Sequence, residues 1–139
     1  MASKQNTYKN KSVMIIDDND IDNFINEKML KSSCFSENVY THTSVTSALE
    51  FLKNLSSIQN IPDALIPGYI FLDINMPILD GFHFLQEFNS LGYSFIPKIK
   101  IVMLTTSLNP CDLEKTKEYK NVIAYLYKPL VQADIEKLV

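Results

Sequence analysis

The sequence predicts an α/β fold in which a doubly wound, five-stranded parallel sheet is built from five β-α units. Two observations predict this fold. Short apolar runs without polar alternation indicate strands that are buried on both faces, as strands of parallel sheets are. Segments with the spacing of amphipathic helices separate these runs, and this alternation favours a parallel sheet with right-handed crossovers and helices on both faces.

Five segments are predicted to be strands. Four are continuous apolar runs of the length expected for buried strands, at residues 13–16, 69–72, 99–104 and 122–127. A weaker run at residues 38–42 is predicted to be a strand near an edge of the sheet. The segment between residues 56 and 67 is expected to be a longer loop without chemistry.

The segments between the strands are predicted to be helices because their apolar residues recur every three or four positions. Three such stripes are expected to pack on the sheet. The first consists of Ile21, Phe24, Ile25 and Met29; the second of Val45, Ala48, Leu49 and Leu52; the third of Phe82, Phe84, Leu85, Phe88 and Leu91. A fourth helix is expected to start with Asn109 as N-cap and Pro110 as first residue and to run to about Lys120. A last helix is expected after Pro129.

Length and charge narrow the possible functions. The chain has 139 residues, which is the length of one domain, and we expect a polar lead at residues 1–11 and the domain at 12–139. All 13 basic residues are lysines, and the formal net charge is −3. Readers of DNA sequence depend on bidentate arginine and a basic surface, so nucleic-acid binding is disfavoured.

Cysteine usage and hydropathy indicate the compartment. Cys34 and Cys111 lie far apart and fit neither a metal-binding nor a CxxC redox pattern, so both are expected to be reduced thiols. No apolar run approaches the roughly 18 residues of a membrane span. We therefore expect a soluble, cytoplasmic protein that does not bind membranes.

Polar residues follow four of the predicted strands. These residues are Asp17 and Asp18, Asp73, Thr105 and Thr106, and Lys128 followed by Pro129. Functional sites of parallel α/β sheets lie beyond the carboxyl ends of the strands. We therefore expect three carboxylates, a hydroxyl and an ammonium group to meet at one edge of the sheet.

This set of groups predicts a particular chemistry. Clustered carboxylates repel one another and favour a hard divalent cation, and oxygen-only ligation is the preference of Mg²⁺. Bound magnesium attracts phosphate, whose oxygens Lys128 and Thr105 would contact. Phosphoryl transfer needs mainly positioning and charge neutralisation, and one carboxylate would act as the nucleophile to give an acyl phosphate.

The string FLDINMPILDGF around Asp73, taken with the early acidic pair, Thr105 and Lys128-Pro129, resembles the receiver domain of two-component response regulators. The resemblance extends from about Ser12 to the C-terminus and has five features in the family's order and spacing. It implies a flavodoxin-like sheet of the receiver type. It also implies that Asp73 is the phosphoacceptor, that Thr105 is the switch hydroxyl and that Lys128 is the family's invariant lysine.

The same resemblance implies further roles. Asp18 matches the direct Mg²⁺ ligand, Asp17 a ligand that acts largely through metal-bound water, and the backbone carbonyl of Asn75 the third protein ligand. Tyr125 matches the aromatic residue whose rotamer reports activation. A cis peptide bond is implied before Pro129, and Asp80 is expected to be an N-cap rather than a ligand.

The implied function is a phosphoacceptor that signals by a conformational switch, not a turnover enzyme. The resemblance implies that a histidine kinase or a histidine phosphotransfer protein is the phosphodonor. We expect this donor to dock at the first helix, near Asn23 and Phe24. Because the apolar stripe of that helix is expected to be core, only its exposed edge would serve. The fourth helix, fifth strand and fifth helix would contact a downstream protein. The chain is expected to act as a stand-alone receiver that is a monomer or a weak phosphorylation-dependent dimer.

Two alternatives stay open. The first is a degenerate receiver that acts as an interaction module without phosphorylation, although every catalytic position is filled. The second is a small aspartate-nucleophile phosphohydrolase with Asp18-Asn19-Asp20 as its DxD motif, although the residues that usually follow that motif and a late acidic pair are missing.

Overall fold

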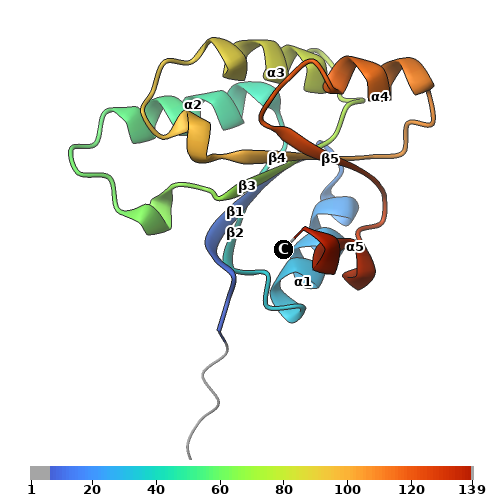
Figure 1. Cartoon of the computed structure of the whole chain (residues 1–139), viewed down its shortest axis with the longest axis horizontal. Helices are drawn as coiled ribbons and strands as arrows, with labels where there is room; N and C mark the ends of the chain where they lie inside the picture. The colour runs from blue at the N-terminus through green and yellow to red at the C-terminus, as the bar shows by residue number, and fades with distance from the viewer. Residues whose placement is uncertain (1–6, 139) are drawn as a thin grey trace, which may run out of the picture.

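The computed structural model describes residues 7–138 and contains one parallel sheet with strand order β2-β1-β3-β4-β5 (Figure 1). The strands are β1 (Asn10–Ile16), β2 (Ser36–His42), β3 (Tyr69–Leu72), β4 (Lys100–Thr105) and β5 (Val122–Tyr127). The helices are α1 (Asp20–Ser32), α2 (Val45–Ser56), α3 (Gly81–Ser90), α4 (Pro110–Thr116) and α5 (Gln132–Lys137), with short 3₁₀ turns η1 (Asp63–Leu65) and η2 (Ile96–Lys98). The predicted fold class is therefore confirmed.

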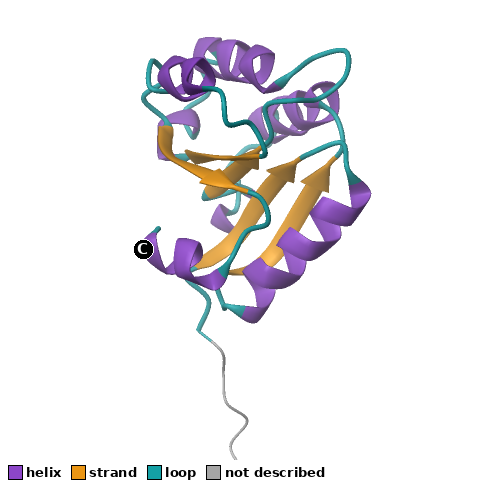
Figure 2. Cartoon of the chain, turned by 90° about the vertical axis from the view of Figure 1, so that its right-hand side faces the viewer, coloured by secondary structure: helices purple, strands orange, loops and turns teal. Residues whose placement is uncertain are grey.

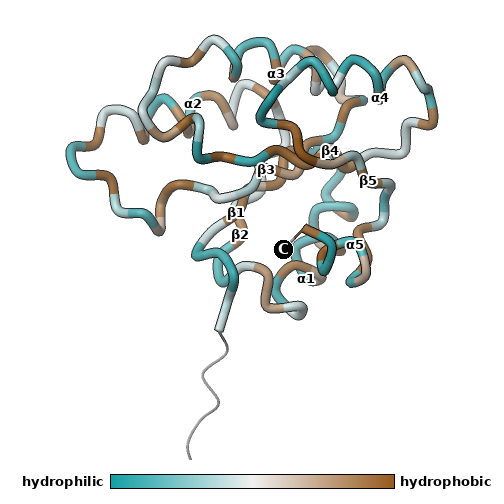
Figure 3. Tube along the Cα trace, viewed as in Figure 1, coloured by the Kyte–Doolittle hydropathy of each residue, from teal (hydrophilic) through white to brown (hydrophobic). Residues whose placement is uncertain are grey.

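The helices form a layer on each face of the sheet (Figures 1 and 2). Helices α2, α3 and α4 lie on one face, and α1 and α5 lie on the other. Alternate residues of each strand point into the two layers: Met14 and Ile16 of β1 belong to the core under α2 and α3, whereas Val13 and Ile15 belong to the core under α1 and α5. This burial on both faces explains the continuous apolar runs of β1, β3 and β4, of which that of β4 is visible in Figure 3.

The predicted strands are confirmed: β3 and β5 have the predicted ends, and the ends of β1, β2 and β4 differ by one to three residues. The first strand begins at Asn10, three residues earlier than its apolar run, because Asn10 already pairs with Ser36 of β2. The weak run 38–42 is the edge strand β2, as expected. Residues 1–6 of the predicted lead and the last residue of the predicted domain lie outside the described part of the chain.

Helices α2, α3 and α4 begin where side chains cap them. Ser44, Asp80 and Asn109 each accept a hydrogen bond from a backbone N–H in the first turn of their helix. The predicted caps Asp80 and Asn109 are thus confirmed. Helix α4 ends at Thr116 rather than near Lys120, because the N–H groups of the following residues bond to carbonyls three positions back instead of four.

The expected orientation of α1 is wrong. Three residues of its apolar stripe face solvent: Ile21, Phe24 and Ile25 are 71%, 62% and 44% exposed. The buried residues are instead Asn23, Asn26 and Leu30. The side chain of Asn23 donates to the carbonyl of Asp17 (2.9 Å), and that of Asn26 accepts from the N–H of Leu130 (3.2 Å), so polar contacts orient this helix.

Two smaller expectations concern thiols and membranes. Cys34 and Cys111 are both free thiols. Within residues 7–138, no helix has both the length and the apolar character that crossing a membrane requires.

Candidate functional site

The predicted site residues converge at the carboxyl edge of the sheet. Asp17 follows β1, Asp73 follows β3 and Lys128 follows β5, and the sheet ladder extends into each of them. The N–H of Asp73 donates to the carbonyl of Ile16 and the N–H of Lys128 to the carbonyl of Thr105, both at 3.0 Å. Backbone pairing therefore fixes the positions from which these side chains reach the site.

A lysine ammonium group is the centre of the site. The Nζ atom of Lys128 lies 2.5 Å from Asp17 Oδ2, 3.0 Å from Asp22 Oδ2 and 3.2 Å from Asp73 Oδ2. The side chains of Lys128, Asp17 and Asp73 are only 9%, 3% and 6% exposed. Three carboxylates thus surround one largely buried cation.

Three of the acidic residues have the arrangement of a metal site. Carboxylate oxygens of Asp17, Asp18 and Asp73 all lie within 4.8 Å of one another, and Asp18 faces solvent. The N–H of Asn19 donates to Asp17 Oδ1 at 2.9 Å and holds that carboxylate in place. Because every donor is a hard oxygen, this set fits Mg²⁺ better than a soft transition metal.

Burial and charge act in opposite directions on the pKa values of Asp17 and Lys128. Burial raises the pKa of Asp17, although its hydrogen bond to Lys128 acts in the opposite direction. Burial alone would lower the pKa of Lys128, but the hydrogen bonds to Asp17 and Asp22 and the charge of Asp73 outweigh it and raise this pKa. Lys128 is therefore a permanent cation at neutral pH.

Thr105 and Tyr125 meet at the loop that follows β4. The hydroxyl oxygen of Thr105, which is buried, accepts a hydrogen bond from the N–H of Ser107 at 3.2 Å. The phenol of Tyr125 donates to the carbonyl of the same Ser107 at 3.2 Å. The two predicted switch residues are thus connected through one residue of the loop, two positions beyond Thr105.

The loop after Asp73 is held close to the site. The N–H of Gly81 donates to the carbonyl of Ile74 (2.9 Å), and a Cβ atom at Gly81 would overlap the carbonyl oxygen of Asp73. Asn75 lies exposed in this loop, and its role as a carbonyl ligand stays a prediction. On the other side of the site, the implied cis peptide bond between Lys128 and Pro129 is confirmed.

Sequence reasoning missed Asp22. It lies in the first turn of α1, and its carboxylate contacts the ammonium group of Lys128. One signal could have indicated Asp22. Helix α1 starts only three residues after Asp17, so its first turn must lie beside the strand end that carries the acidic pair. The prediction for α1 placed its apolar stripe on the core, which would turn Asp22 away from the site; in the structure most of that stripe faces solvent.

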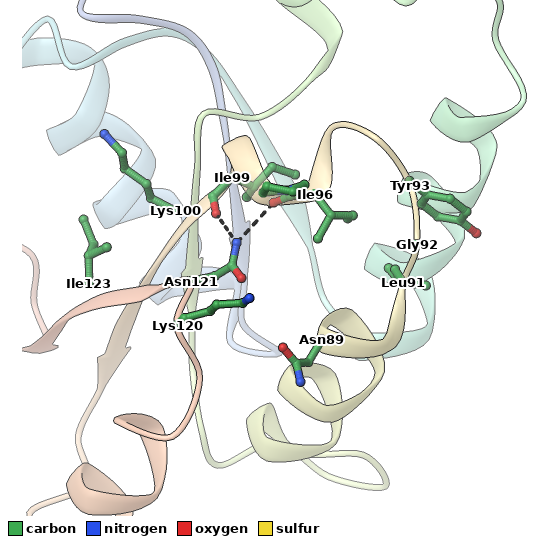
Figure 4. A pocket seen from close by; sticks show the side chains of 11 residues that line it. Asn89, Leu91, Gly92, Tyr93, Ile96, Ile99, Lys100, Lys120, Asn121 and Ile123 are labelled. Carbon is green, nitrogen blue, oxygen red and sulfur yellow. Dashed lines mark hydrogen bonds between the residues drawn. The ribbon is translucent and has the colours of Figure 1, made fainter.

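A hollow of about 470 Å³ lies at the opposite, amino edge of the sheet (Figure 4). Its wall includes Lys100, Lys120 and Asn121, and no carboxylate is among its lining residues. The amide of Asn121 already donates to the carbonyls of Ile96 (3.1 Å) and Ile99 (2.8 Å). The acidic cluster, and not this hollow, therefore contains the groups for chemistry.

Comparison with known proteins agrees with this geometry. The chain is 29% identical to the response regulator Rcp1 of Synechocystis over 93% of its own length and 84% of that protein. A solved two-component response regulator from Cytophaga hutchinsonii is 30% identical, with a TM-score of 0.80 over 91% of this chain and 92% of that one.

Two further similar structures are of a phosphorylated and of a metal-bound response regulator. One is the phosphorylated cyanobacterial phytochrome response regulator RcpA, with 25% identity and a TM-score of 0.71 over 93% of this chain and 88% of that one. The other is the Mn²⁺-bound form of Rcp1, with 26% identity and a TM-score of 0.69 over 92% of this chain and 88% of that one.

The model of the response regulator receiver domain family matches residues 13–139, which is nearly the whole chain. That match includes the strand ends that bring Asp17, Asp73 and Lys128 together. The chain belongs to the response regulator receiver domain family and acts in two-component signalling.

Proposed function

We propose that Asp73 is the residue that accepts the phosphoryl group, from a phosphohistidine of a partner protein. The observation that supports this assignment is the contact of the buried Asp73 carboxylate with Lys128 beside two further acids. An oxygen of Asp73 attacks the phosphorus, the P–N bond breaks and its electron pair stays on the imidazole nitrogen. The product is an acyl phosphate on Asp73.

Lys128 and Thr105 would stabilise the transferred group. Lys128 carries the only ammonium group within reach of Asp73 among the described residues, so it is the cation that would meet a phosphoryl oxygen. Thr105 ends the neighbouring strand β4 and offers a hydroxyl donor to a second oxygen. Phosphoryl transfer depends mainly on positioning and charge stabilisation of this kind.

The proposed metal is Mg²⁺, held by Asp17, Asp18, Asp73 and the backbone carbonyl of Asn75. The all-oxygen donor set supports a hard divalent cation, and a related structure is the Mn²⁺-bound form of Rcp1. When bound, Mg²⁺ supplies positive charge that offsets the charge of the phosphoryl oxygens.

The proposed switch couples Thr105 to Tyr125. A phosphoryl group on Asp73 would draw the Thr105 hydroxyl toward it and displace the N–H of Ser107 from the Thr105 oxygen. Tyr125 bonds to the carbonyl of Ser107 and would move with this residue. The shift in population between two forms would then reach β5 and α4, beside which this loop lies.

The exposed face of α1 is the proposed docking site for the phosphodonor. Ile21, Phe24 and Ile25 present apolar surface next to the acidic cluster, and Lys28 lies over the Phe24 ring at 5.2 Å. Exposed apolar patches of this kind mark protein-interaction sites. The proposed output surface is α4, β5 and α5, where Ile123 and Tyr127 are exposed on the edge strand. The proposed compartment is the cytoplasm.

Acetyl phosphate with Mg²⁺ provides the test of the acceptor. Intact mass should increase by one acid-labile phosphoryl group in the wild type and in Asp63→Asn, an exposed control, but not in Asp73→Asn. Labelling of Asp73→Asn at the wild-type level contradicts the assignment. No labelling of the wild type would favour the interaction module, and continuous hydrolysis of a generic phosphate ester would favour the phosphohydrolase.

The docking face is tested with a phosphorylated histidine phosphotransfer protein as donor. Phe24→Ala should slow transfer from this protein roughly tenfold, because exposed aromatic anchors contribute strongly to interfaces, while labelling by acetyl phosphate stays unchanged. Ile58→Ala removes an exposed apolar side chain beyond the end of α2 and should change neither rate. Equal rates of transfer to wild type and Phe24→Ala would refute this docking site.

A further inference from the structure

Asp22 is a fourth carboxylate at the site, and it comes from a different element than the others. Asp17, Asp18 and Asp73 follow strands, whereas Asp22 belongs to the first turn of α1. Its oxygen lies 3.0 Å from Lys128 Nζ, and its side chain is 33% exposed. Asp22 is not part of the group of acids whose oxygens lie within 4.8 Å of one another. Its contact is therefore with the lysine and not with the proposed metal triad.

Lys128 and a divalent cation compete for the same two carboxylates. The ammonium group has three N–H donors, and two of its three partners are Asp17 and Asp73, which belong to the triad. A cation bound by these two carboxylates would repel the lysine at short range in a poorly solvated site. Metal binding therefore requires Lys128 to loosen its contacts with Asp17 and Asp73.

Asp22 is held where it retains the lysine during that change. The side chain of Asn19 accepts a hydrogen bond from the N–H of Asp22 at 3.0 Å. One residue further, Asn23 bonds to the carbonyl of Asp17, and one turn further Asn26 bonds to the N–H of Leu130, two residues beyond Lys128. The first turns of α1 are thus fastened to both the acidic pair and the segment that carries the lysine.

We propose that Asp22 is a positioning residue that draws Lys128 away from Asp17 and Asp73 and thereby sets the affinity of the site for Mg²⁺. This proposal rests on the proposed function of the triad as the Mg²⁺ site. With Asp22 present, the ammonium group of Lys128 keeps one carboxylate partner when Asp17 and Asp73 bind the metal. Without it, Lys128 is bound only by triad oxygens, and the metal must displace it completely.

The test is a calorimetric titration of the full chain with Mg²⁺ alone, without a phosphodonor. Asp22→Asn should raise the Kd for Mg²⁺ about three- to tenfold, which lies in the lower part of the range of coupling between residues in contact. Asp20→Asn is the control, because it removes the same charge from the same helix turn and Asp20 has no ion pair among residues 7–138. The Kd of this variant for Mg²⁺ should stay within about twofold of the wild-type value. Asp22→Glu restores the carboxylate and should recover part of the affinity.

The double variant separates positioning from plain charge. In the background of Lys128→Met, where the competing ammonium group is gone, Asp22→Asn should change the Kd by less than about twofold, because Asp22 acts through Lys128 and the effects of two contacting residues are not additive. A wild-type Kd in Asp22→Asn overturns the proposal, as does an equal weakening with and without Lys128. Absence of Mg²⁺ binding to the wild type would instead refute the proposed metal site itself, so the two failures are distinguishable.

Discussion

Replacing Lys128 by methionine should destabilise the protein in the absence of divalent cations and make its stability depend strongly on Mg²⁺. Methionine keeps the length of the apolar stem, so the substitution removes charge with little change in packing. It leaves Asp17 and Asp73, which are 3% and 6% exposed, facing each other without a cation.

The size of the effect follows from the burial of these groups. Removing one partner of a buried ion pair costs about 3–5 kcal/mol, because the remaining charge is left uncompensated. Here Asp22 is one-third exposed and Asp18 faces water, so part of the excess negative charge is solvated. We therefore expect a loss of about 3 kcal/mol in the free energy of unfolding, at the lower end of that range.

Magnesium should reverse part of this loss. A ligand that binds only the folded state at 100 times its Kd adds about 2.7 kcal/mol. Without the competing ammonium group, the variant should bind Mg²⁺ more tightly than the wild type does. The wild type also gains stability from Mg²⁺, so the deficit shrinks only by the difference in affinity. If the variant binds Mg²⁺ tenfold more tightly, the deficit should fall by about 1.4 kcal/mol, to about 1.6 kcal/mol in saturating Mg²⁺.

Urea unfolding followed by circular dichroism, in EDTA and in Mg²⁺, measures both quantities. Lys120→Met removes an exposed lysine and should leave the stability within about 0.5 kcal/mol of wild type in both conditions. If Lys128→Met is as stable as wild type in EDTA, or gains no more from Mg²⁺ than wild type does, the assignment of Lys128 as the counter-ion of the acidic cluster is refuted.

Two further predictions concern a glycine and a histidine. Gly81→Ala should lower the free energy of unfolding by about 1–3 kcal/mol, because its Cβ would overlap the carbonyl of Asp73 and lie 2.9 Å from Ile74 Cα. Gly92→Ala is the control and should not destabilise the protein, because a Cβ there meets nothing within 4 Å. Equal thermal midpoints for the two variants would contradict the prediction. Burial lowers the pKa of His42 from its ordinary value of 6.5, so the folded protein binds fewer protons than the unfolded chain and loses stability as the pH falls through that value. Urea unfolding at pH 7.5 and 5.5 should show a smaller loss for His42→Gln than for wild type, and equal losses would show that His42 does not contribute.

The fold and the convergence of the site were predictable because both depend on strand positions. Continuous apolar runs located the strands of a sheet buried on both faces, and the polar residue after each run is fixed by the backbone ladder. Asp73 and Lys128 therefore meet regardless of how the helices pack. The caps Asp80 and Asn109 were predictable for a similar local reason, since each bonds within the first turn of its own helix.

The orientation of α1 was not predictable from periodicity. A stripe of apolar residues normally faces the core, but Asn23 and Asn26 occupy the buried side because each has a backbone partner on another segment. Those partners, Asp17 and Leu130, come together only after the chain has folded. The contact of Asp22 with Lys128 depends on the same orientation, so it was missed for the same reason.

The attachment of α1 through two buried amides separates the residues that hold this helix from those of the proposed docking face. The contacts of Asn23 and Asn26 hold the helix in place, while Ile21, Phe24 and Ile25 point outward and contribute little to the core. Exchanges among exposed residues usually change stability by less than about 0.5 kcal/mol. The proposed docking face could therefore be exchanged by mutation to change its preference for a partner without loss of the fold.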